Sequence, residues 1–340
     1  MSFNDQNQNE ISNIEVKIHK KLFSSLSFAF LAYILLTQGL AVIGVLLTQR
    51  LFPEYIDSGN YLMWLNAIVQ YAIAFPILLL IVKRIPKNAP KKENIGASSI
   101  FGYLLVGMLF MYVGTVISQG ILTNLENIFG SSIEDSLTEM LTGGDWYISL
   151  LFVGILAPIV EELMFRKIFI DRLTPYGSAV AILFPSLIFG LFHGNLYQFF
   201  YAFALGMIFS YIYLRTGKII YPILLHTFIN IFCGVIPSVL MTTLDYDELL
   251  TLVESGADVR PFVINNFLPL MLLGLYETIY FGLIVAGLVV FIRSVKRVRL
   301  EKGRVRLPAS RVADVIFFNP GAIALITACI IIIALNTIPY

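Results

Sequence analysis

Nine apolar segments of roughly membrane-spanning length recur along this chain, and they limit its fold more than any other feature. A bilayer offers no hydrogen bonds to the backbone, so such a chain crosses it as α-helices of about 20 apolar residues. The composition agrees, because 58% of the 340 residues are hydrophobic and 13% are charged. The sequence therefore predicts an all-α, polytopic transmembrane helical bundle of about eight to nine spans, with segments at 24–48, 62–82, 100–124, 147–170, 178–193, 196–214, 218–237, 268–292 and 315–336.

Positive charges are distributed unevenly between the predicted loops. If the N-terminus is cytoplasmic, only Arg50 and Arg260 of the 23 Lys and Arg residues fall on outer segments. Basic loops stay on the cytoplasmic side, so we expect a multi-pass protein of the cell membrane with its N-terminus inside. The predicted loop Arg293–Arg311 would favour anionic membrane lipids. Nothing in the charge pattern indicates a nucleic-acid partner.

The chain shows no internal repeat and no soluble domain. Residues 1–22 are polar and then basic, and we expect them to form a disordered cytoplasmic tail. The apolar run that follows is too long for the core of a cleaved signal peptide. Residues 23–340 are predicted to form a single transmembrane domain.

Two adjacent carboxylates, Glu161 and Glu162, interrupt the fourth apolar segment. A charge in hydrocarbon costs on the order of 2.5 to 3.5 kcal/mol, so an acid at membrane depth indicates function. On a helix, Glu162 and Arg166 are four residues apart and can pair, whereas Glu161 points about 100° away from Glu162. We therefore expect Arg166 to neutralise Glu162 and Glu161 to remain available for chemistry. A further acid, Glu277 in the eighth segment, either pairs within the bundle or lines the substrate path.

Two of the three histidines, His193 and His226, also lie in predicted spans. Glu161 with His193 would supply a base and its orienting partner, able to take a proton from water. His226 and Asn230 are four residues apart, so they project from one helix face as neighbouring hydrogen-bond donors. A water activator beside an oxyanion stabiliser is the equipment for hydrolysing a carbonyl compound.

The motifs Glu-Glu-x-x-x-Arg, Phe-x-x-x-His and His-x-x-x-Asn, in this order on separate helices, resemble those of the CPBP family of intramembrane proteases. This family is also called the CAAX protease or Abi family and includes type II CAAX prenyl endopeptidases. The resemblance covers about 147–237. It implies catalytic roles for Glu161, Glu162, His193, His226 and Asn230, with structural support from Arg166 and Phe189.

The resemblance implies an intramembrane endopeptidase that hydrolyses a peptide bond near the cytoplasmic side of the membrane, in a membrane-associated peptide or protein. Family members from eukaryotes and archaea remove the C-terminal tripeptide of prenylated CAAX proteins. Bacterial members are linked to peptide maturation, bacteriocin self-immunity and regulation of membrane signalling proteins. The alternative is a non-proteolytic membrane immunity or regulatory partner. A proton-relay transporter is a third interpretation, but the chain lacks the internal symmetry of such proteins.

These residues suggest one possible cofactor, the divalent metal zinc. Glu161, His193 and His226 are zinc ligands in type and number, and the family has been described as metalloproteases. However, the His-Glu-x-x-His helix of zincins is absent, and Arg166 would place a guanidinium near the cation. We expect metal-free activation of water by Glu161 and His193, with zinc held by the three residues as the alternative.

The predicted helix 178–193 creates a conflict of depth. Glu161 and His226 lie about 12 to 13 Å from the inner ends of their spans, whereas His193 lies about 22 Å from residue 178. An upright helix would keep His193 away from Glu161. We therefore expect this helix to be tilted or to begin outside the bilayer, and the Gly194-Asn195 turn to be buried in protein. Glu161, His193, His226 and Asn230 should then converge on one cavity that opens toward the cytoplasm.

Overall fold

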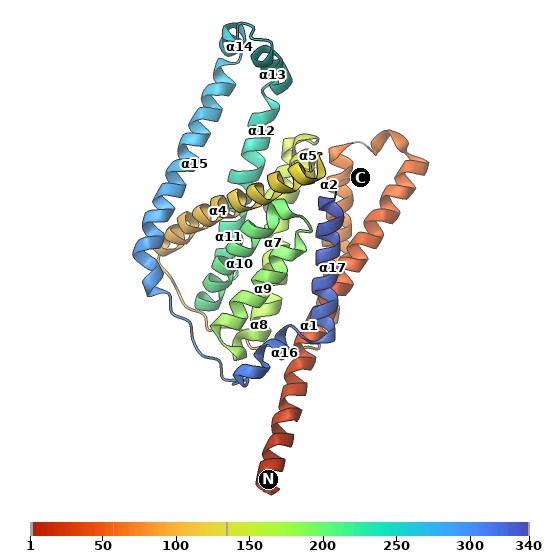
Figure 1. Ribbon diagram of the computed structural model, residues 1–340, viewed down its shortest axis with the longest axis vertical. Helices are drawn as coiled ribbons and strands as arrows, with labels where there is room; N and C mark the ends of the chain where they lie inside the picture. Colours follow the sequence, from red (N-terminus) through yellow and green to blue (C-terminus); the bar gives the residue numbers. More distant parts are fainter. Residues whose placement is uncertain (1–2, 57, 134, 339–340) are drawn as a thin grey trace.

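The computed structural model describes residues 3–56, 58–133 and 135–338, and within these ranges the chain is almost entirely helical (Figure 1). The only isolated β-bridge in this part of the chain joins Gly177 to Lys302. The predicted all-α fold is confirmed. The α-helices are α1 (Phe3–Leu51), α2 (Gly59–Ala67), α3 (Phe75–Val82), α4 (Ala97–Phe129), α5 (Ser136–Thr142), α6 (Trp146–Ser149), α7 (Ala157–Glu162), α8 (Phe169–Leu173), α9 (Ser178–Phe192), α10 (Leu196–Thr216), α11 (Ile220–Asn230), α12 (Ile236–Thr242), α13 (Tyr246–Glu254), α14 (Arg260–Asn265), α15 (Phe267–Ser294), α16 (Val312–Ile316) and α17 (Pro320–Thr337).

Eight helical stretches of the described chain are long and apolar enough to cross a membrane. The ninth predicted segment, α9, has 15 residues. Its length of about 22 Å is less than the hydrocarbon thickness of about 30 Å. The protein is therefore a multi-pass membrane protein with eight candidate spans and one short apolar helix. The spans are Glu15–Leu51, Gly59–Val82, Ala97–Phe129, Trp146–Tyr176, Leu196–Thr216, Ile220–Thr242, Phe267–Arg297 and Pro320–Thr337.

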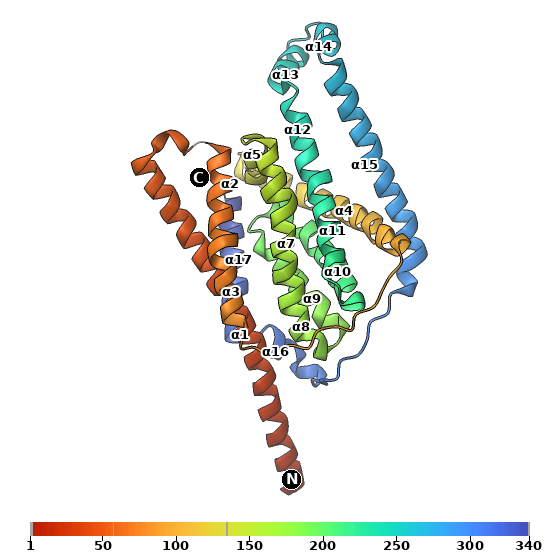
Figure 2. The same ribbon diagram turned by 180° about the vertical axis from the view of Figure 1, so that it is seen from behind.

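The N-terminal segment differs from its prediction. Residues 3–22 were expected to be disordered, but they are helical and continuous with the first span in α1, which projects beyond the other helices (Figures 1 and 2). Starting a helix is costly, whereas each added residue extends it at little cost. The apolar span supplies the nucleus, and the polar segment is added to its end.

Several spans contain a wider, π-helical turn next to a proline. Three of the four π segments in the described chain come directly before an α-helix whose second residue is proline: Pro76, Pro158 and Pro237. Proline has no N–H, and its ring clashes with the carbonyl four residues earlier, so a wider turn accommodates it. The π segments are η2 (Ile68–Ala74), η3 (Leu150–Leu156), η4 (Leu163–Ile168) and η6 (Ile231–Val235), and the 3₁₀ turns are η1 (Pro53–Tyr55), η5 (Thr174–Tyr176), η7 (Val295–Arg297) and η8 (Ala309–Arg311).

Helices α9 and α10 form a hairpin near the centre of the molecule. Helix α4 packs between α10 and α15 and is strongly tilted relative to both (Figures 1 and 2). The close approach of α4 to α10 depends on Gly114, where an added Cβ would lie 2.5 Å from the backbone of Tyr201. On the other side, α1 packs against α17 and α3. The Phe30 ring of α1 lies 4.3 Å from Phe169 and 5.5 Å from Phe165, so a buried aromatic core fixes the helix that carries both glutamates.

The predicted basic and acidic segments lie at opposite ends of the bundle. The beginning of the α1 span, α8 and α16 are at one end, whereas α5, α13 and α14 are at the other (Figure 1). This arrangement agrees with the charge pattern from which we inferred the orientation. The orientation itself stays a prediction.

The turn between α9 and α10 lies inside the protein, as predicted. Gly194 is buried with a φ of 69°, which favours glycine. Its carbonyl accepts a hydrogen bond from Asn336 Nδ2 of α17 at 2.9 Å. Asn195 donates from Nδ2 to the His193 carbonyl at 3.0 Å and accepts from the Gln198 backbone N–H at 2.8 Å. These bonds satisfy irregular backbone within the bundle, and the short α9 can therefore end at His193.

Candidate active site

Glu161 and Glu162 end α7, a short α-helical segment between the π segments η3 and η4. Glu162 Oε2 pairs with Arg166 Nε at 3.1 Å, and both side chains are completely buried. The Glu161 side chain is 28% exposed and lines a cavity. The predicted pairing is confirmed: Arg166 neutralises Glu162 and leaves Glu161 facing the cavity.

Two aromatic rings stabilise the buried Arg166 guanidinium. Its Cζ lies 4.3 Å from the centre of the Phe189 ring and 5.3 Å from that of Phe209. Among the described residues, Nη1 and Nη2 have no hydrogen-bond partner, so the rings occupy the place of polar ligands. A desolvated cation–π contact is worth about 2 kcal/mol or more. Phe209 could not be predicted from the sequence, because one more phenylalanine in an apolar helix carries no signal.

His226 contacts both glutamates. Its Nδ1 lies 2.8 Å from Glu162 Oε1, and its Nε2 lies 3.7 Å from Glu161 Oε2. Because the ionised Glu162 only accepts, we assign a hydrogen to Nδ1 that it donates to this carboxylate. Glu162 therefore binds Arg166 with one oxygen and orients His226 with the other. Only the contact of Glu162 with Arg166 was predicted from the sequence, although a carboxylate has two oxygens.

His193 ends α9 and is held by its own helix. Its Nδ1 lies 2.8 Å from the Phe189 carbonyl oxygen. A carbonyl only accepts, so Nδ1 donates, and in the neutral ring Nε2 carries a lone pair. His193 lines the same cavity as Glu161, and the Phe189 ring packs edge-on against it with centroids 4.8 Å apart. Phe189 thus contacts His193 and Arg166 at once.

Asn230 repairs a break in the helix that carries the glutamates. In η3 the backbone bonds run from each residue to the fifth before it, as from Ala157 N–H to the Phe152 carbonyl. The next donor in this series would be Pro158, which has no N–H for the Val153 carbonyl. Asn230 Nδ2 donates to that carbonyl at 2.9 Å instead. One amide hydrogen of Asn230 is therefore engaged, and a second remains.

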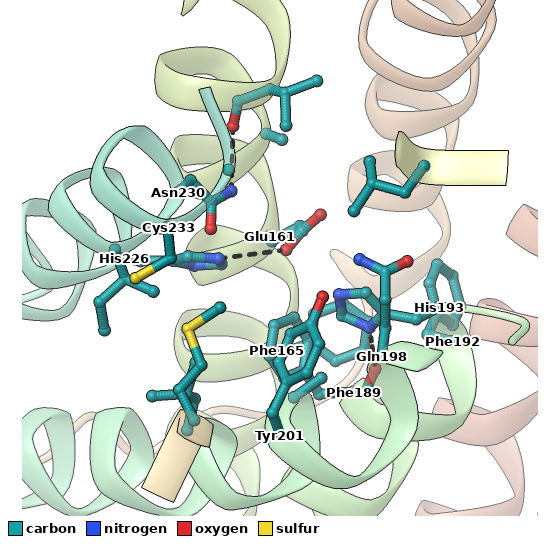
Figure 3. A pocket seen from close by; sticks show the side chains of 18 of the residues that line it. Glu161, Phe165, Phe189, Phe192, His193, Gln198, Tyr201, His226, Asn230 and Cys233 are labelled. Atoms are coloured by element: carbon teal, nitrogen blue, oxygen red, sulfur yellow. Dashed lines mark hydrogen bonds and ion pairs between the residues drawn. The ribbon is translucent and has the colours of Figure 1, made fainter. Parts of the chain in front are cut away.

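The four predicted side chains Glu161, His193, His226 and Asn230 line one cavity of about 300 Å³. Figure 3 shows Glu161 between the ring of His226 and that of His193, with Asn230 next to His226. The side chains come from α7, α11 and the end of α9. The predicted convergence is confirmed. The histidine within ion-pair distance of Glu161, however, is His226 and not His193.

Other polar residues of the cavity were missed from the sequence. Gln198 and Tyr201 of α10 face it (Figure 3), and Gln70 and Tyr71 of η2 complete its wall. Gln198 was detectable as an isolated amide in an apolar helix, but the tyrosines resemble ordinary core residues. Glu277 does not line the cavity and lies on the exposed side of α15.

The candidate zinc ligands do not fit a zinc ion as they are placed. Zinc needs ligand atoms about 2.0 to 2.3 Å from the metal. The hydrogen bonds at Nδ1 of His193 and of His226 leave Nε2 of each ring free, so they do not count against a metal. Among the described residues, however, no three His, Cys, Asp or Glu side chains are gathered closely enough to hold one. The mechanism below therefore includes no metal-dependent step.

The chain is similar in sequence to known membrane peptidases. Residues 143–232 match the family described as Type II CAAX prenyl endopeptidase Rce1-like. The Bacillus subtilis protein named "Putative membrane peptidase YdiL" is 29% identical over 173 residues, which are 49% of this chain and 68% of that protein. The Staphylococcus aureus "Membrane-embedded CAAX protease MroQ" is 29% identical over 180 residues, 48% of this chain and 69% of that protein. No solved structure is significantly similar to the chain.

Proposed function

Because the chain belongs to the Rce1-like type II CAAX prenyl endopeptidase family and is a membrane-embedded peptide hydrolase, we propose that it cleaves a membrane-associated peptide or protein beside Glu161. One observation carries the proposal: Glu161, His193, His226 and Asn230 meet at a single cavity in a bundle of apolar helices.

Glu161 is the base in the proposed mechanism. Its carboxylate reaches the cavity and is not held by Arg166, which pairs with Glu162. A water molecule in the cavity donates one hydrogen to Glu161 and the other to the free Nε2 of His193. Its oxygen then attacks the scissile carbonyl carbon while Glu161 takes the proton. Glu161 later returns this proton to the leaving amine, so the reaction consumes one water and regenerates the carboxylate.

His226 and Asn230 are the oxyanion donors. Its Nδ1 is bound to Glu162, so an N–H at Nε2, on the cavity side, is the donor that this ring offers the oxyanion. The second amide hydrogen of Asn230 supplies a neighbouring donor, because the first is fixed on the Val153 carbonyl. Fixed donors act on the charge that develops in the transition state, and removing one typically costs about 10² to 10³ in turnover.

We propose that the scissile bond lies nearer the cytoplasmic side. His226 comes six residues after Ile220, which begins α11. At 1.5 Å per residue this is about 9 Å from the helix end that follows Arg215 and Lys218. Basic residues mark the cytoplasmic side of a membrane protein. A substrate anchored in the cytoplasmic leaflet would therefore reach the cavity with little insertion.

The test is mass spectrometry of membrane peptides from cells that contain the wild-type chain, Glu161→Gln or Glu277→Gln. The matched control removes an acid from an exposed site on α15. New peptide ends should accumulate with the wild type and with Glu277→Gln but not with Glu161→Gln, at equal protein levels. Peptide ends that appear equally with Glu161→Gln would refute the catalytic role of this residue. A cellular effect that persists with no new peptide ends would favour a non-proteolytic role.

A further inference from the structure

A second crevice, separate from the catalytic cavity, lies between the end of α3 and the segment η4–α8. It measures about 500 Å³. Hydrogen bonds join its two walls: Arg172 Nη2 donates to the Val82 carbonyl at 2.7 Å, and the Asn88 backbone N–H donates to the Asp171 carbonyl. The crevice is thus a built feature of the fold.

The polar half of this crevice is strongly cationic. Lys83, Arg84, Lys87, Lys167 and Arg172 line it, against one acid. That acid, Asp171, is already engaged, because it accepts from Lys167 Nζ at 3.0 Å and from Tyr213 Oη at 2.7 Å.

Several of these positive groups have no counterion. Within the described chain, Lys83, Arg84 and Lys87 make no ion pair, and all three are exposed. The buried Nε of Arg172 has no hydrogen-bond partner there either. The crevice therefore carries positive charge that an anion would neutralise.

The other half of the crevice is apolar and faces the predicted hydrocarbon region. Phe75, Leu79 and Leu163 line it. Phe75 precedes Lys83 by eight residues, about 12 Å along the helix. Leu80, next to Leu79, is 69% exposed on the outer face of this span. A soluble phosphate would use only the cations, whereas a phospholipid uses both halves.

We propose that this crevice binds an anionic phospholipid, with its phosphate among Lys83, Arg84, Lys87 and Lys167 and an acyl chain against Phe75, Leu79 and Leu163. The headgroup then lies against the exposed face of η4, because Lys167 is 45% exposed while its neighbour Arg166 is fully buried against Glu162. The bound lipid contacts the segment that holds the catalytic carboxylates in place.

The test is native mass spectrometry of the full-length protein from micelles with equal amounts of phosphatidylglycerol and phosphatidylcholine of identical acyl chains. The variant Lys83→Gln/Arg84→Gln/Lys87→Gln is compared with Lys17→Gln/Lys21→Gln/Lys92→Gln, which removes the same charge from exposed positions that do not line the crevice. At about 1 kcal/mol per cation, the first variant should lose the preference for phosphatidylglycerol about tenfold or more, and the second should keep it.

A charge-retaining variant and a competition experiment test the same crevice. Lys83→Arg/Lys87→Arg retains the charges and should retain the lipid preference. Free glycerol phosphate should not displace the lipid, since it has no chain for the apolar half. Equal losses in both glutamine variants, loss in the arginine variant, or displacement by glycerol phosphate would each overturn the proposal.

Discussion

At the residue scale, the site depends on the two oxygens of Glu162. One pairs with Arg166 and the other orients His226, so a fully buried carboxylate links a structural cation to a cavity-facing ring. Spacing along one helix was enough to predict the first contact. The second joins residues 64 positions apart, and no helical periodicity reports such a contact.

Arg166→Ala should destabilise the protein far more than Glu161→Gln. The first change leaves the buried Glu162 without its cation, which typically costs about 3 to 5 kcal/mol. The second keeps the shape of a side chain that is partly exposed to the cavity. Thermal unfolding in detergent measures both, and similar losses of stability would contradict the unequal roles. Adding Glu162→Gln to Arg166→Ala should recover part of the loss, because no buried charge then remains unpaired.

At the element scale, the short segments around the glutamates were hidden from the sequence. The prolines at 76, 158 and 237 were visible, but an apolar helix with a π turn has the same composition as one without it. The turn between α9 and α10 was predictable, because a helix of 178–193 could not bring His193 to the depth of Glu161 in any other way. The predicted disorder of the N-terminal tail was wrong for residues 3–22, because the helix of the adjoining span continues through them.

Asn230→Ala should reduce both stability and turnover, for separable reasons. Stability falls because the Val153 carbonyl loses its donor, at a cost of about 1 to 3 kcal/mol. Pro158→Ala restores a backbone N–H at the broken position, so Asn230→Ala should cost less stability in that background. The kcat should fall in both backgrounds with KM within a few-fold. Equal stability losses with and without Pro158 would contradict the repair role, and a raised KM at constant kcat would assign Asn230 to binding.

At the scale of the whole molecule, hydropathy predicted all of the spans, and length decided which segment was too short to be one. The packing of the outer helices was less predictable, because lipid-facing and core-facing apolar residues look alike. One contact that hydropathy does not report joins the two ends of the chain: Lys20 Nζ of α1 lies 2.6 Å from Asp314 Oδ1 of α16.

The contact between α1 and α16 should depend on pH. The hydrogen bond from Lys20, together with the charges of Lys20 and Arg311, lowers the pKa of Asp314 below its ordinary value of about 3.8. A lowered pKa in the folded state stabilises the protein above the unfolded pKa, and this contribution disappears as the pH falls through the folded value. Asp314→Asn should therefore lower the Tm at pH 6, and the difference from the wild type should shrink as the pH falls below 3.8. A difference that persists at low pH would assign the effect to packing.

Turnover by the purified protein tests whether Glu161 is the base of a peptide hydrolase. The measurement is kcat of Glu161→Gln in proteoliposomes on a peptide that spans a cleavage site found by the mass spectrometry of membrane peptides. Tm is recorded on the same samples, and Glu277→Gln is the control. Loss of a general base costs about 10² to 10⁴ in rate. We predict such a loss for Glu161→Gln at unchanged Tm and near wild-type turnover for Glu277→Gln. Turnover of Glu161→Gln within a few-fold of wild type would contradict this prediction.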